Sequence, residues 1–72
     1  MRRIAFDYYG LYLLKYLQEE NDPRQTDDDF VNGRAEAAAE EFEQASREGM
    51  SVDASQERAM VVLMDGLTQQ EQ

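Results

Sequence analysis

The sequence of 72 residues has no cysteine and no histidine, and 16 acidic against 7 basic residues give it a net charge of −9. A chain of this length buries only about 60% of its unfolded surface, so its core alone gives marginal stability. Disulfide bonds and the common zinc sites are excluded because their ligands are missing from the sequence. We therefore expect a homo-oligomer or a protein partner to add the missing stability.

The negative charge also limits the partners. An acidic surface repels phosphate groups, and the sequence has no cluster of Lys and Arg, so we expect no direct nucleic-acid binding.

The N-terminus resembles a secretory signal, because the basic residues Arg2 and Arg3 precede an apolar stretch. Asp7 and Lys15 interrupt that stretch and so argue against a signal. No apolar run approaches the roughly 18 residues of a membrane span. We expect a cytoplasmic protein without a membrane partner.

The first helix is predicted over residues 4–20, with a polar inter-helix loop at residues 19–26. Its core face is predicted from apolar residues at three- and four-residue steps, which are Ala5, Phe6, Tyr9, Leu13, Tyr16 and Leu17. A second apolar line, Ile4, Tyr8 and Leu11, lies on another side of this helix. Three short helices can bury one face of each helix but not two. The second line therefore predicts an interface.

The second helix is predicted over residues 27–48, with Thr26 as its N-cap and Asp29 completing a capping box. Its inner face is predicted to hold Val31, Ala35, Ala38, Phe42 and Ala45. The outer face is predicted to hold Glu36, Glu40, Glu43 and Arg47. Gly49 is expected to end the helix in a left-handed conformation. The alanine-rich stretch is thus interpreted as a surface for helix packing.

The third helix is predicted over residues 52–67, with Ser51 as its N-cap. Its inner face is predicted to hold Val52, Ala59, Met60, Leu63 and Leu67. Val61 and Val62 are added to the predicted interface, and residues 68–72 are expected to form a disordered tail. The chain is therefore predicted to be all-α, a single three-helix domain over residues 1–72 that self-association or a partner completes.

No arrangement of residues points to catalysis or ligand binding. Di-iron sites in helical bundles and serine nucleophiles both require a histidine, which the sequence lacks. The run of Asp27, Asp28 and Asp29 does not have the alternating spacing of a calcium loop, and no glycine-rich phosphate loop occurs. We expect no enzyme activity, no catalytic residue, no cofactor, no metal site and no small-molecule substrate.

Three blocks of the sequence resemble a known family. They are "YYGLYLLKYL" from Tyr8 to Leu17, "DDDFVNGRAEAAAEEFEQASREGMS" from Asp27 to Ser51, and "AMVVLMDGL" from Ala59 to Leu67. Their order and spacing are similar to domain of unknown function eighteen ninety-six, an all-helical family of Bacteroides-group bacteria. The resemblance implies a helical fold and brings no catalytic residues. It also implies that the gene for this protein lies near mobile-element or conjugative-transposon genes, because family members are often encoded there.

Two functions fit these observations. The leading hypothesis is a non-catalytic helical interaction protein, either a homodimer or an accessory subunit, with Ile4, Tyr8, Leu11, Val61 and Val62 at the interface. The alternative is an acidic nucleic-acid mimic that occupies the basic groove of a DNA-binding protein. Salt distinguishes the two, because charge pairs are screened beyond about 8 Å at physiological ionic strength, whereas apolar contacts are not.

Overall fold

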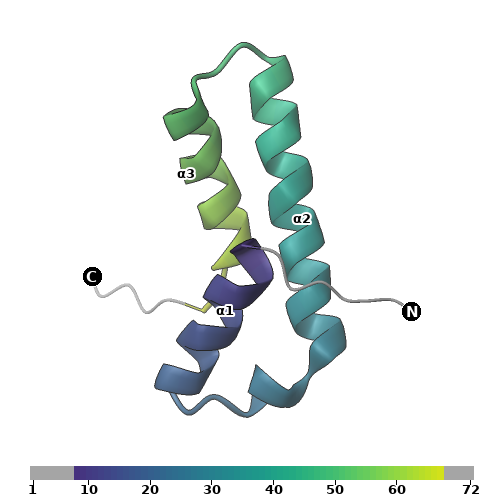
Figure 1. Ribbon diagram of the computed structural model, residues 1–72, viewed down its shortest axis with the longest axis vertical. Helices are drawn as coiled ribbons and strands as arrows, with labels where there is room; N and C mark the ends of the chain where they lie inside the picture. The colour runs from purple at the N-terminus through teal and green to yellow at the C-terminus, as the bar shows by residue number, and fades with distance from the viewer. Residues whose placement is uncertain (1–7, 68–72) are drawn as a thin grey trace.

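The computed structural model describes residues 8–67 of the chain. Its elements in chain order are α1 (Tyr8–Glu19), the short 3₁₀ helix η1 (Pro23–Thr26), α2 (Asp28–Arg47) and α3 (Val52–Leu63). α1 and α3 lie on the same side of α2, α1 beside its first half and α3 beside its second half (Figure 1). The predicted all-α fold with three helices is confirmed. The predicted positions of Ile4, Ala5, Phe6 and the tail at 68–72 fall outside the described residues.

The link between α1 and α2 is more ordered than a plain loop, and the predicted N-cap of α2 is wrong. Asp22 accepts a hydrogen bond from the Arg24 amide at 2.9 Å and so caps η1. Thr26 lies inside this turn, where its hydroxyl donates to the carbonyl oxygen of Pro23 at 3.2 Å. Asp27 is the first residue after η1 with extended backbone, and its carboxylate accepts from the Phe30 amide at 3.1 Å. Asp27 therefore caps α2 in place of Thr26.

The turn between α2 and α3 follows the prediction. Gly49 has a φ of +94°, in the left-handed region that glycine tolerates best. The amides of Gly49 and Met50 donate to the carbonyl oxygens of Ser46 and Ala45 at 3.0 and 3.1 Å, which is the Schellman pattern of a helix end. Ser51 then caps α3 by accepting from the Ala54 amide at 3.1 Å. The short turn fixes α3 antiparallel to α2 (Figure 1).

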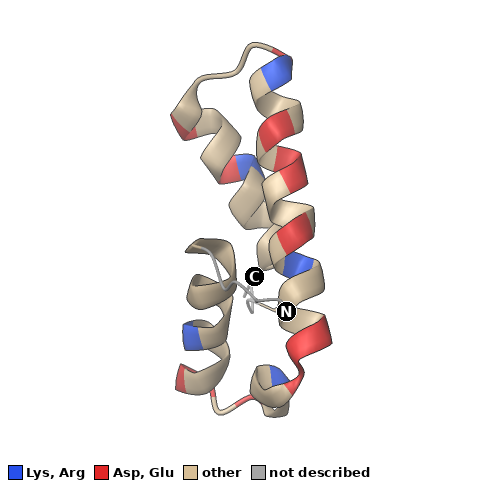
Figure 2. Ribbon diagram, turned by 45° about the vertical axis from the view of Figure 1, so that its right-hand side comes forward, with Lys and Arg blue, Asp and Glu red and all other residues tan. Residues whose placement is uncertain are grey.

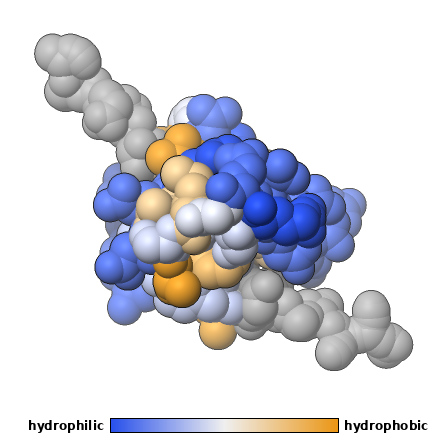
Figure 3. Space-filling view, turned by 90° about the horizontal axis from the view of Figure 1, so that it is seen from above, coloured by the Kyte–Doolittle hydropathy of each residue, from blue (hydrophilic) through white to orange (hydrophobic). Residues whose placement is uncertain are grey.

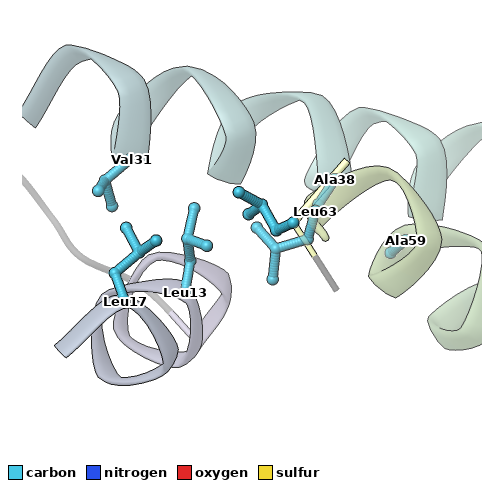
Figure 4. Close-up of a cluster of buried hydrophobic side chains, with 7 residues drawn as sticks. Leu13, Leu17, Val31, Ala38, Ala59 and Leu63 are labelled. Carbon is cyan, nitrogen blue, oxygen red and sulfur yellow. The ribbon is translucent and has the colours of Figure 1, made fainter. Parts of the chain in front are cut away.

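The core lies along the side of α2 that faces both other helices. Its fully buried apolar residues at 0–1% exposure are Leu13, Leu17, Val31, Ala38, Ala45, Ala59 and Leu63. All of them except Ala45 are labelled in Figure 4. Alanines on α2 and α3 allow close helix approach, while leucines from α1 and α3 supply most of the buried volume. The predicted inner faces of α1 and α2 are confirmed for the described residues, with Tyr9, Tyr16 and Phe42 half-buried at the edge of the core.

The first and last turns of the predicted third helix differ from the structure. Val52 is 71% exposed, whereas Ser55 is fully buried against Ser46 of α2. The reason is that Ser55 takes the α2-facing position in this turn, which leaves Val52 at the helix edge. α3 ends at Leu63, because the chain then turns through Gly66 at a φ of +79°. Leu67 lies beyond the helix but is still buried, as predicted.

Candidate interaction surface

α1 carries exposed apolar side chains opposite its buried face. Tyr8 is 58% exposed, Leu11 55% and Tyr12 45%. The Tyr8 ring meets the Tyr9 ring edge-on at 5.4 Å between centroids and lies 6.2 Å from the Tyr12 ring. Tyr8 and Leu11, which are predicted to lie at an interface, are thus exposed in the described chain, and Ile4 lies outside the described residues. Tyr12 was missed, although its four-residue spacing from Tyr8 is the signal that places it beside that residue.

Val61 and Val62 of α3, both predicted at the interface, differ in exposure. Val61 is 70% exposed, whereas Ala59 and Leu63, each two positions away, are buried. Residues two positions apart on a helix point in nearly opposite directions, so Val61 faces away from the core. Val62 is half-buried and lines a hollow that also includes Ala37 of α2. Val61 is therefore available to a partner to a much greater extent than Val62.

An open apolar groove lies where the three helices meet. Its volume is about 520 Å³, and its lining residues are Tyr8, Tyr9, Ala39, Phe42, Glu43, Val52 and Gln56. The Tyr9 hydroxyl donates to Gln56 Oε1 at 2.8 Å and so bridges α1 and α3 beside the groove. Viewed along the long axis, apolar side chains gather in one region bordered by hydrophilic surface (Figure 3). Sequence reasoning missed this groove because its walls come from three separate helices.

Acidic residues recur along α2 (Figure 2), and one of them, Glu43, lines the apolar groove. Glu36, Glu40 and Glu43 are exposed on one line of α2, as predicted. Among residues 8–67, these three form no ion pair. Arg47, also exposed on this line as predicted, offsets one of the three charges, so the line keeps an excess of negative charge.

Arg58 is the main ionic link between α2 and α3. Its Nε donates to Glu41 Oε2 at 2.8 Å, and its Nη1 donates to Glu48 Oε1 at 3.2 Å. Hydrogen bonds from Gln44 and Arg58 lower the pKa of Glu48, and the Glu41 and Glu48 carboxylates raise the pKa of Arg58. This cluster links the end of α2 to α3, the helix that also supplies Val52 and Gln56 to the groove.

Within residues 8–67, no three acidic side chains come together in a way that could hold a metal ion. The helices of this same range are too short or too polar for any of them to cross a bilayer.

Comparisons with known proteins give one result. Neither the curated proteins nor the solved structures include a match to this chain. The model of one family, described as Domain of unknown function (DUF1896), matches residues 2–71 and thus nearly the whole chain. The resemblance carried by the three sequence blocks is therefore confirmed, and the chain belongs to the DUF1896 family.

Proposed function

We propose that this protein is a non-catalytic helical interaction protein that forms a homodimer through the outer face of α1. The observation that carries the proposal is the exposure of Tyr8, Leu11 and Tyr12 on a helix whose opposite face is already buried. Covering an apolar side chain of this size is worth about 1.5–3 kcal/mol. Such a gain is large for a chain with a small core.

The charge distribution favours a second copy as the occupant of this face. Two chains of net charge −9 repel each other, so they associate best where the acidic residues are absent. The segment from Tyr8 to Gln18 has no acidic residue and contains the basic Lys15. Two α1 helices can therefore pack together along this segment without a carboxylate, and Glu19 at the end of α1 is paired with Lys15 at 3.9 Å. An accessory subunit of a larger assembly would use the same face.

The test is the oligomeric state of the full chain and of a double variant, Leu11→Glu with Tyr12→Lys. Sedimentation equilibrium at tens of micromolar should give a dimer for the parent and a monomer for the variant. The melting temperature of the parent should rise with protein concentration, and that of the variant should not. Arg47→Glu is the control, because it changes the charge at an exposed position near the end of α2 without removing apolar surface from α1. A monomeric parent contradicts the homodimer.

The second candidate function is an acidic nucleic-acid mimic, and the exposed line of Glu36, Glu40 and Glu43 favours it. A mimic would bind the basic groove of a DNA-binding protein through these carboxylates. Its binding should fall steeply as salt rises, whereas an association through Leu11 and Tyr12 should persist. Replacing the three glutamates by glutamine separates the two candidates, because only the mimic depends on their charge.

A further inference from the structure

We propose that the groove between α1, α2 and α3 binds a short cationic amphipathic helix of another protein. This inference rests on the proposed role as an interaction protein and names a class of partner for it. The groove adjoins the outer face of α1: the two surfaces share Tyr8, but Leu11 and Tyr12 do not line the groove.

The apolar part of the groove is suited to an inserted side chain. Phe42 and Tyr9 are half-buried, while Val52 is 71% exposed, and all three line the groove. Ala39 also lines it, with only a methyl group. An apolar residue of a partner helix can therefore contact Phe42 and Val52 together. Helices bind such grooves through apolar residues at three- and four-residue spacing.

The charge next to the groove selects the partner. Glu43 lines the groove, and Glu40 and Glu36 continue from it along the same side of α2 at three- and four-residue steps. Within residues 8–67 none of these carboxylates forms an ion pair. With Arg47 on the same line, three acidic residues against one basic residue leave this side of α2 with a net charge of −2. A second copy of this acidic chain would be repelled here, whereas Lys or Arg residues beside the inserted apolar residue would be attracted.

The test uses a synthetic peptide of about 15 residues that contains only Leu and Lys, with Leu at helical spacing and a fluorescent label. Fluorescence anisotropy with the full chain at physiological salt should show saturable binding. Glu43→Lys and Val52→Lys should each weaken binding by about tenfold, because each places a cation in the groove. The control Glu57→Lys changes the net charge as Glu43→Lys does, but at an exposed position of α3 that does not line the groove. It should weaken binding by less than about twofold.

A second peptide of the same composition, with Leu and Lys in an order that gives no apolar helix face, should bind at least about tenfold more weakly. Equal binding of the two peptides, equal effects of Glu43→Lys and Glu57→Lys, or no binding at all would each overturn the groove proposal. Circular dichroism of each variant checks that its helices are intact. The homodimer is tested separately through Leu11 and Tyr12, so loss of peptide binding with an intact dimer refutes only the partner proposed for the groove.

Discussion

Arg34 of α2 donates a hydrogen bond from Nη1 to the main-chain oxygen of Asp65 at 2.8 Å, just beyond the end of α3. The same nitrogen lies 3.1 Å from the carbonyl oxygen of Leu63, and the guanidinium carbon lies 5.1 Å from the centre of the Phe30 ring. Carbonyl groups at a helix end lack partners within the helix. Arg34 therefore supplies the C-terminal cap of α3 from a neighbouring helix and joins the two elements.

Replacing Arg34 by Met should lower the free energy of unfolding by about 1.5–3 kcal/mol, the usual range for a hydrogen-bonded charged group. The reason is that the carbonyl oxygens of Leu63 and Asp65 lose their donor while part of the side-chain volume is kept. Urea unfolding measures the change. Arg47→Met, at an exposed position of the same helix, should alter stability by less than about 0.5 kcal/mol. Equal losses for the two variants would contradict the capping role.

Leu13 and Leu11 differ in burial and should differ in their effect on stability. Leu13 is fully buried, so Leu13→Ala should cost about 2–5 kcal/mol and leave much of the chain unfolded. Leu11 is 55% exposed, so Leu11→Ala should cost little in a monomer. Thermal melts of both variants at two protein concentrations give the result. A Leu11→Ala loss that grows with protein concentration would indicate an interface, and unchanged stability in Leu13→Ala would contradict the assigned core.

Asp22 should contribute stability that depends on acid pH. A side-chain hydrogen bond from Arg24, reinforced by the Arg24 amide, lowers the pKa of Asp22 from 3.8 to about 2. Because the folded pKa lies below the ordinary value, this stabilisation is complete above that ordinary value and is lost as the pH falls through about 2. Asp22→Asn should therefore lower the melting temperature at neutral pH. It should also reduce the fall in melting temperature between pH 3.8 and about pH 2. Melting temperatures across this range test it, and Arg24→Gln should reproduce the effect because Arg24 is the main cause.

Ser55 is a buried polar residue with a weak partner. Its hydroxyl oxygen lies 3.4 Å from that of Ser46, which is long for a hydrogen bond between hydroxyl groups. Removing the hydroxyl should therefore cost little, and Ser55→Ala should change the free energy of unfolding by less than about 1 kcal/mol. Ser55→Val should destabilise by about 1–3 kcal/mol, since the position is fully buried between α2 and α3. Chemical denaturation compares the two, and a larger loss in Ser55→Ala would show that the hydroxyl pair is stabilising.

The sequence determined the parts of the fold that depend on neighbouring residues. The apolar spacing around Leu13 and Leu17 was enough to predict the buried face of α1, because helical periodicity is local. Gly49 and Ser51 marked the end of α2 and the start of α3 for a similar reason, since each acts on its own turn. Exposure of Tyr8 and Leu11 also followed from periodicity alone.

Tertiary structure decided the features that depend on where one helix lies against another. The cap of α2 moved from Thr26 to Asp27 because η1 includes Thr26 in its turn. Burial of Ser55 rather than Val52 depends on the placement of α3 against α2. Arg34 reaches Asp65 across 31 positions of sequence, and the groove joins residues of three helices. Sequence spacing cannot determine such contacts, because they depend on the crossing of packed helices and not on the period of any one of them.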